Sequence, residues 1–249
     1  MADVEIMSIE GKASNRIALP AAFEEEVRPD LIRRAVLAES SLGLQPQGHF
    51  VLAGMQTTAT YYGRMHAYRT GRHMGRAIRP RQKLGAGVQG LVRRVPSSVK
   101  GKRAHPHMIE KQLTEAINTR EYRKALASAV ASTKPVVVSN AIESVSKTKD
   151  MSKIFNAIIN GGIPESRRVI RKGLRRSART GRYTKSLLFV AGSDCAAVRA
   201  AGNIAGVDSC KVSDITANML SPGGNTGRTV VWSESALSAL DESISARKL

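Results

Sequence analysis

Between Glu39 and Glu110 the chain has no aspartate or glutamate, yet this stretch carries twelve of its 39 lysines and arginines and all five of its histidines. Its glycines recur, and its apolar residues fall singly rather than at the period of a helix or a strand. Such a segment cannot neutralise its own charge or build a packed core, and by itself this composition is typical of disorder. We therefore expect a partner outside the chain to order it.

The residue types in this stretch indicate the kind of partner. Arginine outnumbers lysine, and Tyr61, Tyr62 and Tyr68 lie among the arginines. A guanidinium group pairs with phosphate, and guanidinium and tyrosine planes both stack on unpaired bases, which favours RNA. The residues predicted to bind RNA here are Arg64, Arg69, Arg72, Arg76, Arg79, Arg81, Lys83, Arg93, Arg94, Lys100, Lys102, Arg103 and His105.

The whole chain has the charge balance of a polyanion-binding protein. Its 249 residues carry a formal net charge of +19, and nucleic acid is the commonest partner of so basic a protein. No apolar run is long enough to span a membrane, and the N-terminus does not have the pattern of a signal peptide, so we expect a cytoplasmic protein without membrane contact. Cys195 and Cys210, the only cysteines, form no metal or disulfide pattern.

The N-terminal part predicts the start of an α/β fold. Residues 4–9 alternate weakly, turn at Gly11 and pair with residues 16–19 as a short antiparallel element. A helix follows, with Asp30 as its N-cap and Gly43 at its end. Arg33 and Arg34 lie in the first turn of this helix, where the helix dipole disfavours cations. We expect a group outside the helix to hold these two arginines, and we count both as RNA-binding.

Beyond the acid-free stretch, apolar spacing predicts helices over residues 109–133, 148–159 and 163–179, and a buried strand at residues 136–138. The third helix would carry two cationic ridges with residues spaced by four. Like charges at this spacing destabilise a helix unless an anion lies between them, which favours phosphate contact over a solvated face. The predicted RNA-binding residues here are Arg167, Arg168, Arg171, Lys172, Arg175, Arg176, Arg179 and Arg182.

The C-terminal part alternates strand and helix. We predict strands at residues 187–191 and 229–232, a short segment at 211–213, and helices capped by Ser193 and Ser233, with Trp232 and Leu237 as a hydrophobic staple. This order implies a Rossmann-like α/β fold, a mainly parallel sheet covered by helices. Residues 1–43 and 106–249 would form this globular domain, and residues 44–105 a long extended internal loop embedded in RNA.

Several short patterns could indicate chemistry. Residues 85–90 spell GxGxxG, but no buried strand precedes them and no acid follows at the required distance, so we predict no dinucleotide site. His105 and His107 have no carboxylate or thiolate nearby, so we predict no metal and no cofactor. A ribonuclease with two histidines and a lysine stays an alternative. Residues 192–194 form either a ligand loop or an ordinary turn, and residues 221–227 a turn or a backbone contact to RNA.

Several longer stretches resemble the family of the fourth protein of the large ribosomal subunit. They follow the family's order over nearly the whole chain: VRPDLIRRAVLA at 27–38, AG at 53–54, GKRAHP at 101–106, SAVA at 128–131, SVSKTKD at 144–150, LSPGG at 220–224, GR at 227–228 and WSESAL at 232–237. The RAHP word and the ending of the chain are similar to archaeal members.

The resemblance implies an α/β domain on the subunit surface and a loop threaded into large-subunit ribosomal RNA. The loop tip, near residues 63–76, would help line the nascent-peptide exit tunnel opposite the twenty-second large-subunit protein. The chain departs from the family at this tip, where YYGRMH stands at 61–66 in place of a SWGxGRG type of sequence, and at His107, in place of a second proline. The expected tip residues are Tyr61, Tyr62, Arg64, Met65, His66, Arg69, Arg72 and His73.

The resemblance and the charge together imply a structural constituent of the large ribosomal subunit. It would bind large-subunit ribosomal RNA and other ribosomal proteins, without catalysis of its own and without forming a homo-oligomer. The alternative from another class is an RNA-processing or RNA-modifying enzyme on a Rossmann-like fold. A third reading, a free nucleic-acid-coating protein, would bind duplex DNA about as well as folded ribosomal RNA.

Overall fold

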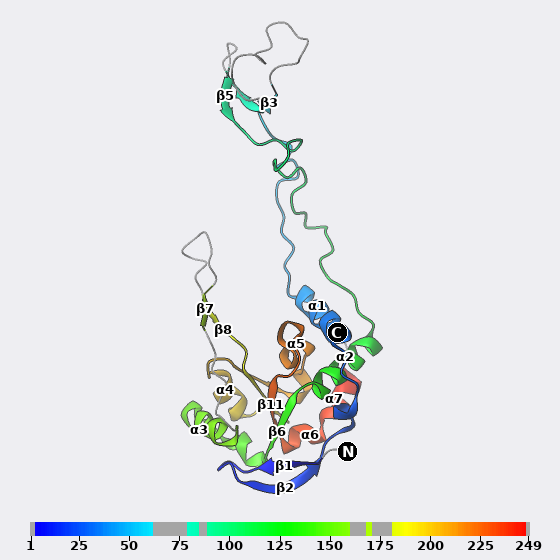
Figure 1. Ribbon diagram of the computed structural model, residues 1–249, viewed down its shortest axis with the longest axis vertical. Helices are drawn as coiled ribbons and strands as arrows, with labels where there is room; N and C mark the ends of the chain where they lie inside the picture. Colours follow the sequence, from blue (N-terminus) through cyan, green and yellow to red (C-terminus); the bar gives the residue numbers. More distant parts are fainter. Residues whose placement is uncertain (1–2, 62–78, 85–88, 160–167, 171–180, 248–249) are drawn as a thin grey trace. The chain divides into compact units, whose positions relative to one another are not determined.

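The chain falls into two compact units. A computed structural model describes residues 3–61, 79–84, 89–159, 168–170 and 181–247 (Figure 1). The first unit joins residues 1–43 to residues 114–249, and the second unit is residues 44–113, inserted after the first long helix. The predicted internal loop ended at residue 105, whereas the second unit continues to residue 113.

The first unit is built on a six-stranded sheet with the strand order β10–β9–β11–β6–β1–β2 (Figure 1). Neighbouring strands are parallel except β1 and β2, which are antiparallel. This confirms the predicted Rossmann-like α/β fold with a mainly parallel sheet. The strands are β1 (Asp3–Met7), β2 (Ala13–Ala18), β6 (Lys134–Val138), β9 (Leu187–Ala191), β10 (Val207–Lys211) and β11 (Thr229–Ser233).

The central strands are apolar because helices cover both of their faces. β9 reads Leu-Leu-Phe-Val-Ala, and all five residues are buried, as expected of a parallel strand in the middle of a sheet. β6, β9 and β11 were all predicted, and the structure confirms them. β10 was not predicted, because Asp208, Ser209 and Lys211 interrupt its apolar residues at the sheet edge. The short segment predicted at 211–213 consists of the last residue of β10 and the start of the 3-10 helix η4 (Val212–Asp214).

Helices cover the two faces unequally. One apolar cluster joins the sheet to five helices, and a second cluster joins the other face to α3 and α4 (Figure 1). The helices are α1 (Pro29–Leu42), α2 (Thr119–Ala131), α3 (Thr148–Ile158), α4 (Ala196–Gly202), α5 (Ala217–Leu220), α6 (Glu234–Ser238) and α7 (Leu240–Ala246), with 3-10 helices η1 (Ala21–Glu24), η2 (Asn140–Ser144) and η5 (Pro222–Gly224). The prediction of α3 is confirmed almost to the residue.

The N-terminal prediction is confirmed except for one helix cap. β1 and β2 form the predicted antiparallel pair, and Gly11 turns the chain with φ +82°. The N-cap of α1 is Arg28 rather than Asp30, because Pro29 occupies the first helical position, where its missing N–H is no loss. Asp30 lies in the first turn and pairs with Arg28 at 2.8 Å. Gly43 ends the helix, as predicted.

The long helix predicted over residues 109–133 is wrong in its first half. α2 begins only at Thr119, and the preceding chain is not helical. Ile109 is 69% exposed, whereas Tyr122 and Leu126 are 1% exposed. Apolar spacing continues through both halves, but of residues 109–118, all of them described, only the half-buried Ile117 packs against the core. Tertiary packing supplies most helical stability, so the first half does not form a helix.

The helix predicted over residues 163–179 is also wrong where the structure describes it. β7 (Arg168–Ile170) and β8 (Gly181–Tyr183) form an antiparallel pair, with Arg168 opposite Tyr183 and Ile170 opposite Gly181. The β-branched pair Val169-Ile170 favours a strand, and a strand does not stack like charges at the i, i+4 spacing of a helix. The two predicted cationic ridges therefore do not exist at these residues.

The two serine caps predicted in the C-terminal part have different outcomes. Ser233 is confirmed, since its hydroxyl accepts a hydrogen bond from the N–H of Ala236 at 3.3 Å, and Trp232 and Leu237 are buried in the same cluster. Ser193 is not the cap of α4, whose N-cap is Cys195 without a side-chain bond.

Burial raises the pKa of the other cysteine, Cys210, to about 12, so this thiol stays protonated.

Candidate nucleic-acid interface

The second unit has almost no core. Its residues assigned as buried are Gly54, Ala59, Pro80 and Val95. The short strands β3 (Ala59–Thr60), β4 (Arg81–Lys83) and β5 (Gln89–Val92) form an antiparallel sheet. A backbone hydrogen bond from His49 to the carbonyl of His107, at 3.3 Å, joins the outgoing and returning passes of the chain. Backbone pairing, rather than burial, holds the described part of this unit together.

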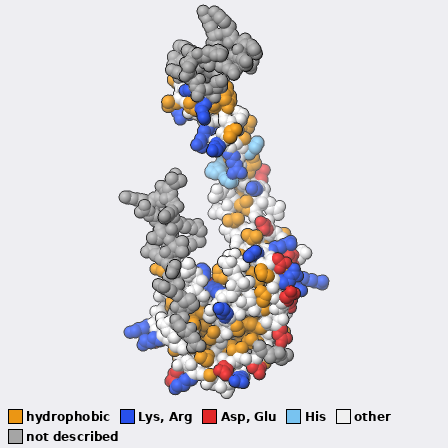
Figure 2. Space-filling view, in the orientation of Figure 1, with side chains coloured by type: hydrophobic (Ala, Val, Ile, Leu, Met, Phe, Trp, Pro, Cys, Tyr) orange, Lys and Arg blue, Asp and Glu red, His pale blue; other side chains and the backbone are white. Residues whose placement is uncertain are grey.

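Exposed apolar side chains gather on the second unit. Of the 16 large hydrophobic side chains exposed in the described part of the chain, twelve belong to it, and Figure 2 shows apolar and basic side chains together there. A surface of this kind is typical of an interaction site. The twelve are Leu44, Phe50, Val51, Leu52, Met55, Tyr61, Leu84, Leu91, Val92, Val99, Met108 and Ile109.

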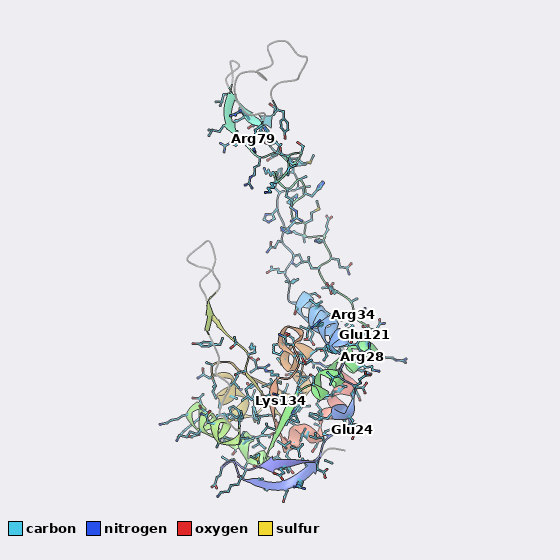
Figure 3. All side chains as sticks on the ribbon, in the orientation of Figure 1. Glu24, Arg28, Arg34, Arg79, Glu121 and Lys134 are labelled. Atoms are coloured by element: carbon cyan, nitrogen blue, oxygen red, sulfur yellow. The ribbon has the colours of Figure 1, made fainter. Side chains whose placement is uncertain are left out.

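The described cations of this unit remain available to an external anion. The only acid of the unit is Glu110, and none of the predicted cations forms an ion pair within the described residues. Arg81 is half-buried, and Lys83 is the last residue of β4. The exposed members of the predicted set are Arg79, which Figure 3 labels, Arg93, Arg94, Lys100, Lys102, Arg103 and His105.

Most of the predicted tunnel tip lies outside the described residues. This holds for Tyr62, Arg64, Met65, His66, Arg69, Arg72 and His73, and for the neighbouring Arg76. Tyr61 is described: its side chain is 51% exposed, and its hydroxyl hydrogen-bonds to the Ser98 hydroxyl. The tip residues therefore stay a prediction from the resemblance.

The basic residues predicted on a helix in the C-terminal half are only partly described. Arg168 lies in β7 and Arg182 in β8, and Val169 is the residue opposite Arg182. The structure brings these two strands together as an antiparallel pair instead of one helical face. Outside the described residues lie Arg167, Arg171, Lys172, Arg175, Arg176 and Arg179.

The two arginines at the start of α1 have different surroundings. Arg34 pairs with Glu121 of α2, with Nη1 and Oε1 3.1 Å apart (Figure 3). The expectation that a group outside the helix holds it is thus confirmed, although that group belongs to this chain. Arg33 is exposed and forms no ion pair or side-chain hydrogen bond within the described residues. Of the two, Arg33 is the one whose charge is free for phosphate.

A carboxylate of the protein itself occupies the carboxyl end of the sheet, where residues 192–194 were a candidate ligand loop. Glu143, which follows β6, accepts hydrogen bonds from the N–H of Gly192 at 3.1 Å and from the hydroxyl of Ser235. Partial burial raises the pKa of this carboxyl, but hydrogen bonds from Ser235, Ser233 and Gly192 outweigh burial and lower the pKa. Glu143 therefore takes up donors that an anionic ligand would use at this crevice.

The remaining candidate patterns have no support in the described part of the chain. A dinucleotide site requires a helix at the end of the GxGxxG stretch, but the strand β5 begins inside it, at Gln89. Residues 85–88 lie outside the described ranges. No group of three His, Cys, Asp or Glu residues is placed there to hold a metal ion. No helix among these residues has the length and apolar character needed to cross a membrane.

Sequence reasoning missed the neutral polar residues that accompany the cations. Gln56, Thr57, Thr58 and Gln82 line one open groove of about 800 Å³ in the second unit, together with Arg93, Arg94 and Lys102. The cations were predicted from charge alone. Amides and hydroxyls in an acid-free basic stretch were the signal that could have found the rest, because these groups match the edges of nucleic-acid bases.

The fold and this surface define a class of protein: an α/β domain that carries a long, acid-free basic insertion with exposed apolar side chains. A model of the ribosomal protein L4/L1 family matches residues 17–243. Three relatives named "Large ribosomal subunit protein uL4" come from Archaeoglobus fulgidus, Methanocaldococcus jannaschii and Methanoculleus marisnigri, at 39%, 37% and 38% identity. These matches cover 96%, 95% and 96% of this chain and 98%, 97% and 98% of the relatives.

The chain therefore belongs to the ribosomal protein L4/L1 family. The relatives named above are archaeal proteins, which confirms the archaeal type expected from the RAHP word and the C-terminal ending.

Proposed function

We propose that the protein is a structural constituent of the large ribosomal subunit, in the cytoplasm, that binds large-subunit ribosomal RNA through residues 44–105 and Arg33. The observation that carries this proposal is the second unit, which has exposed cations, exposed apolar side chains, no ion pairs in its described part and almost no core. Ordering such a segment costs about 1–2 kcal/mol per backbone residue. Phosphate pairing and base stacking offset that cost when RNA surrounds the segment.

The first test is stoichiometry. A structural constituent sediments one-to-one with the large subunit and yields no reaction product. An RNA-modifying enzyme, in contrast, turns over at substoichiometric amounts and releases modified RNA. Sedimentation of the tagged full chain, followed by quantitative mass spectrometry of the subunit fraction, distinguishes the two functions.

The second test is the salt dependence of RNA binding. If each of the twelve cations of the acid-free stretch meets a phosphate, the log–log slope of affinity against salt is of order −8 to −11. Replacing both Arg93 and Arg94 with Gln lowers that magnitude by about 2, since each phosphate contact contributes about 0.9. Lys12→Gln in the first unit, where Lys12 pairs with Glu10 at 2.9 Å, serves as the control. A wild-type slope near −2 contradicts binding through this unit.

The tip of residues 44–105 is proposed to help line the nascent-peptide exit tunnel and to face the twenty-second large-subunit protein. The support is the family membership and the exposed ring of Tyr61, at the start of the predicted tip. A photo-crosslinking amino acid at position 61 should capture the nascent chain or the twenty-second protein in isolated ribosomes. Exclusive capture of proteins on the subunit exterior contradicts this placement. The chain is also proposed not to form a homo-oligomer.

A further inference from the structure

The groove of the second unit has the size of a ligand site. Its volume of about 800 Å³ lies within the range of roughly 300–1,000 Å³ that is typical of small-molecule sites. Four separate stretches of the chain supply its walls: residues 56–58, Gln82 of β4, Arg93 and Arg94 after β5, and Lys102. Backbone hydrogen bonds connect two of these segments, since Arg93 donates to the carbonyl of Pro80 at 3.0 Å.

The described residues that line the groove carry three positive charges and no carboxylate. The Nε of Arg93 donates to the side-chain Oε1 of Gln82 at 3.4 Å. The Nζ of Lys102 donates to the backbone carbonyl of Gln56 at 3.1 Å. Both acceptors are neutral, so neither bond cancels the charge. Three like charges around one groove repel one another unless an anion lies among them, and guanidinium forks suit phosphate oxygens.

The neutral side chains of the groove match a base better than a phosphate. A guanidinium only donates hydrogen bonds, so the oxygen of Gln82 faces Arg93, and its NH₂ group has no acceptor among the described residues. The Gln82 oxygen keeps a second lone pair, so this amide can still both donate and accept, like the edge of a base, whereas a phosphate offers only acceptors. Gln56 lines the same groove and carries a second amide of this kind.

Cations and amides on one concave surface favour an unpaired nucleotide over other polyanions. Bases of a duplex are already paired, so a duplex presents mainly phosphates and sugars, whereas unpaired bases of RNA loops and bulges can enter a pocket. An acidic peptide would satisfy the cations but leave both amides without a base edge to contact. Single-stranded RNA offers both kinds of group, phosphates for the cations and free base edges for the amides.

We propose that this groove holds one unpaired nucleotide of ribosomal RNA. Arg93, Arg94 and Lys102 contact its phosphates, and the amides of Gln82 and Gln56 contact the edge of its base. The inference rests on the proposed function, because it requires the RNA to reach the second unit. It goes further by naming an unpaired nucleotide, and the residues that contact its base, within that contact.

The test is a base-specific footprint of the full chain on large-subunit ribosomal RNA. Dimethyl sulfate and a carbodiimide report the exposure of base edges with wild-type protein, Gln82→Leu, Gln56→Leu and, as a matched control, Gln47→Leu. Gln47 is an exposed glutamine of the same unit and lies outside the groove. We expect a single base, or two adjacent bases, to become reactive about 5-fold or more with the two groove variants. The control variant and the protections elsewhere should be unchanged.

The outcomes separate the two proposals. If wild-type protein protects ribosomal RNA and both groove variants give the same footprint, the nucleotide site is wrong while the proposed function stands. If the wild-type protein protects no ribosomal RNA, the proposed function is wrong. Competition by polyglutamate as strong as that of a single-stranded oligonucleotide of equal charge would assign the groove to an acidic peptide and overturn the inference.

Discussion

A Cβ atom on Gly224 would lie only 2.7 Å from the Cγ of Arg33, so the loop after α5 packs directly on the first turn of α1. Gly224 has φ +80°, and its neighbour Gly223 has φ +67° with no heavy atom within 4 Å of the corresponding position. Two adjacent glycines thus share a left-handed backbone and differ in the space around them. The absence of a side chain at Gly224 leaves room for the aliphatic stem of Arg33. Arg33 is the exposed side chain that is proposed to bind RNA.

Gly224→Ala should destabilise the protein more than Gly223→Ala. Each substitution places Cβ on a left-handed backbone, which costs about 1–2 kcal/mol. Only Gly224→Ala also forces Arg33 aside, an overpacking that typically costs a further 1–3 kcal/mol. Urea unfolding of both variants measures the difference. Equal losses of unfolding free energy would show that the contact with Arg33 has no weight.

The ion pair between Arg228 and Asp208 should contribute far more than an exposed pair of similar geometry. The Nη2 of Arg228 lies 2.8 Å from the Oδ2 of Asp208, and the Arg228 side chain is 3% exposed. Arg228→Met removes this buried donor, although Lys185 still pairs with Asp208. It also leaves the buried carbonyl of Leu187 without its 2.6 Å hydrogen bond from Arg228, so we expect a cost of about 2–3 kcal/mol. Arg16→Met removes the 3.1 Å pair with Glu5, where both side chains are more than half exposed, and should cost about 0–1 kcal/mol. Chemical denaturation of both variants checks the contrast.

Tyr122→Phe should loosen the contact between α1, α2 and α5. The Tyr122 hydroxyl donates to Glu39 at 2.6 Å, and the same carboxylate accepts from the N–H of Ala217 at 2.7 Å. Burial raises the pKa of Tyr122, so this hydroxyl stays a donor at neutral pH. A hydrogen bond to a charged acceptor is worth about 1.5–3 kcal/mol. Thermal unfolding measures the effect of Tyr122→Phe as a lower melting temperature. Tyr183→Phe, at a residue that is 49% exposed, is the control and should change the melting temperature little. An equal change in both variants would count against this role of Tyr122.

Glu143 should make stability depend on pH at the acid limb. Its pKa in the folded protein is below the usual value of 4.5, so the unfolded chain takes up a proton first as pH falls. The stabilisation is therefore complete above about pH 4.5 and is lost as pH drops through the folded pKa. The free energy of unfolding of Glu143→Gln, measured from pH 7 to pH 3, should approach that of the wild type at the acid end. Parallel curves over the whole range would contradict this assignment.

Local patterns predicted the elements that meet the core, and failed where the same patterns continue beyond it. β9 was predicted because all of its residues are apolar, and β11 because of its apolar run at residues 230–232. Ser233 was predicted because an N-cap side chain bonds to the helix that directly follows it. Residues 109–118 carry a helical pattern but contact the core only through Ile117. The long-range pairing of Arg168 with Tyr183 is invisible in local spacing. Both failures are cases in which tertiary contacts overrode spacing.

Charge alone predicted the candidate interface, and the structure added which of its residues are free and which lie together. The absence of acid between Glu39 and Glu110 identified the basic segment. It could not separate Arg33, free within the described residues, from Arg34, paired with Glu121, because that difference depends on which helix packs against α1. Nor could it place Gln56 and Gln82, 26 residues apart by their numbering, on one groove.

The sequence by itself determined the α/β class, the position of the basic insertion and the family, because apolar runs, charge and ordered motifs are written along the chain. Only the tertiary structure decided that β7 and β8 pair, that α2 begins at Thr119, and that Glu143 occupies the carboxyl end of the sheet. These features depend on contacts between residues distant in sequence. A carboxylate acts on whichever N–H and hydroxyl groups the fold brings within hydrogen-bonding distance, and spacing along the chain does not record that distance.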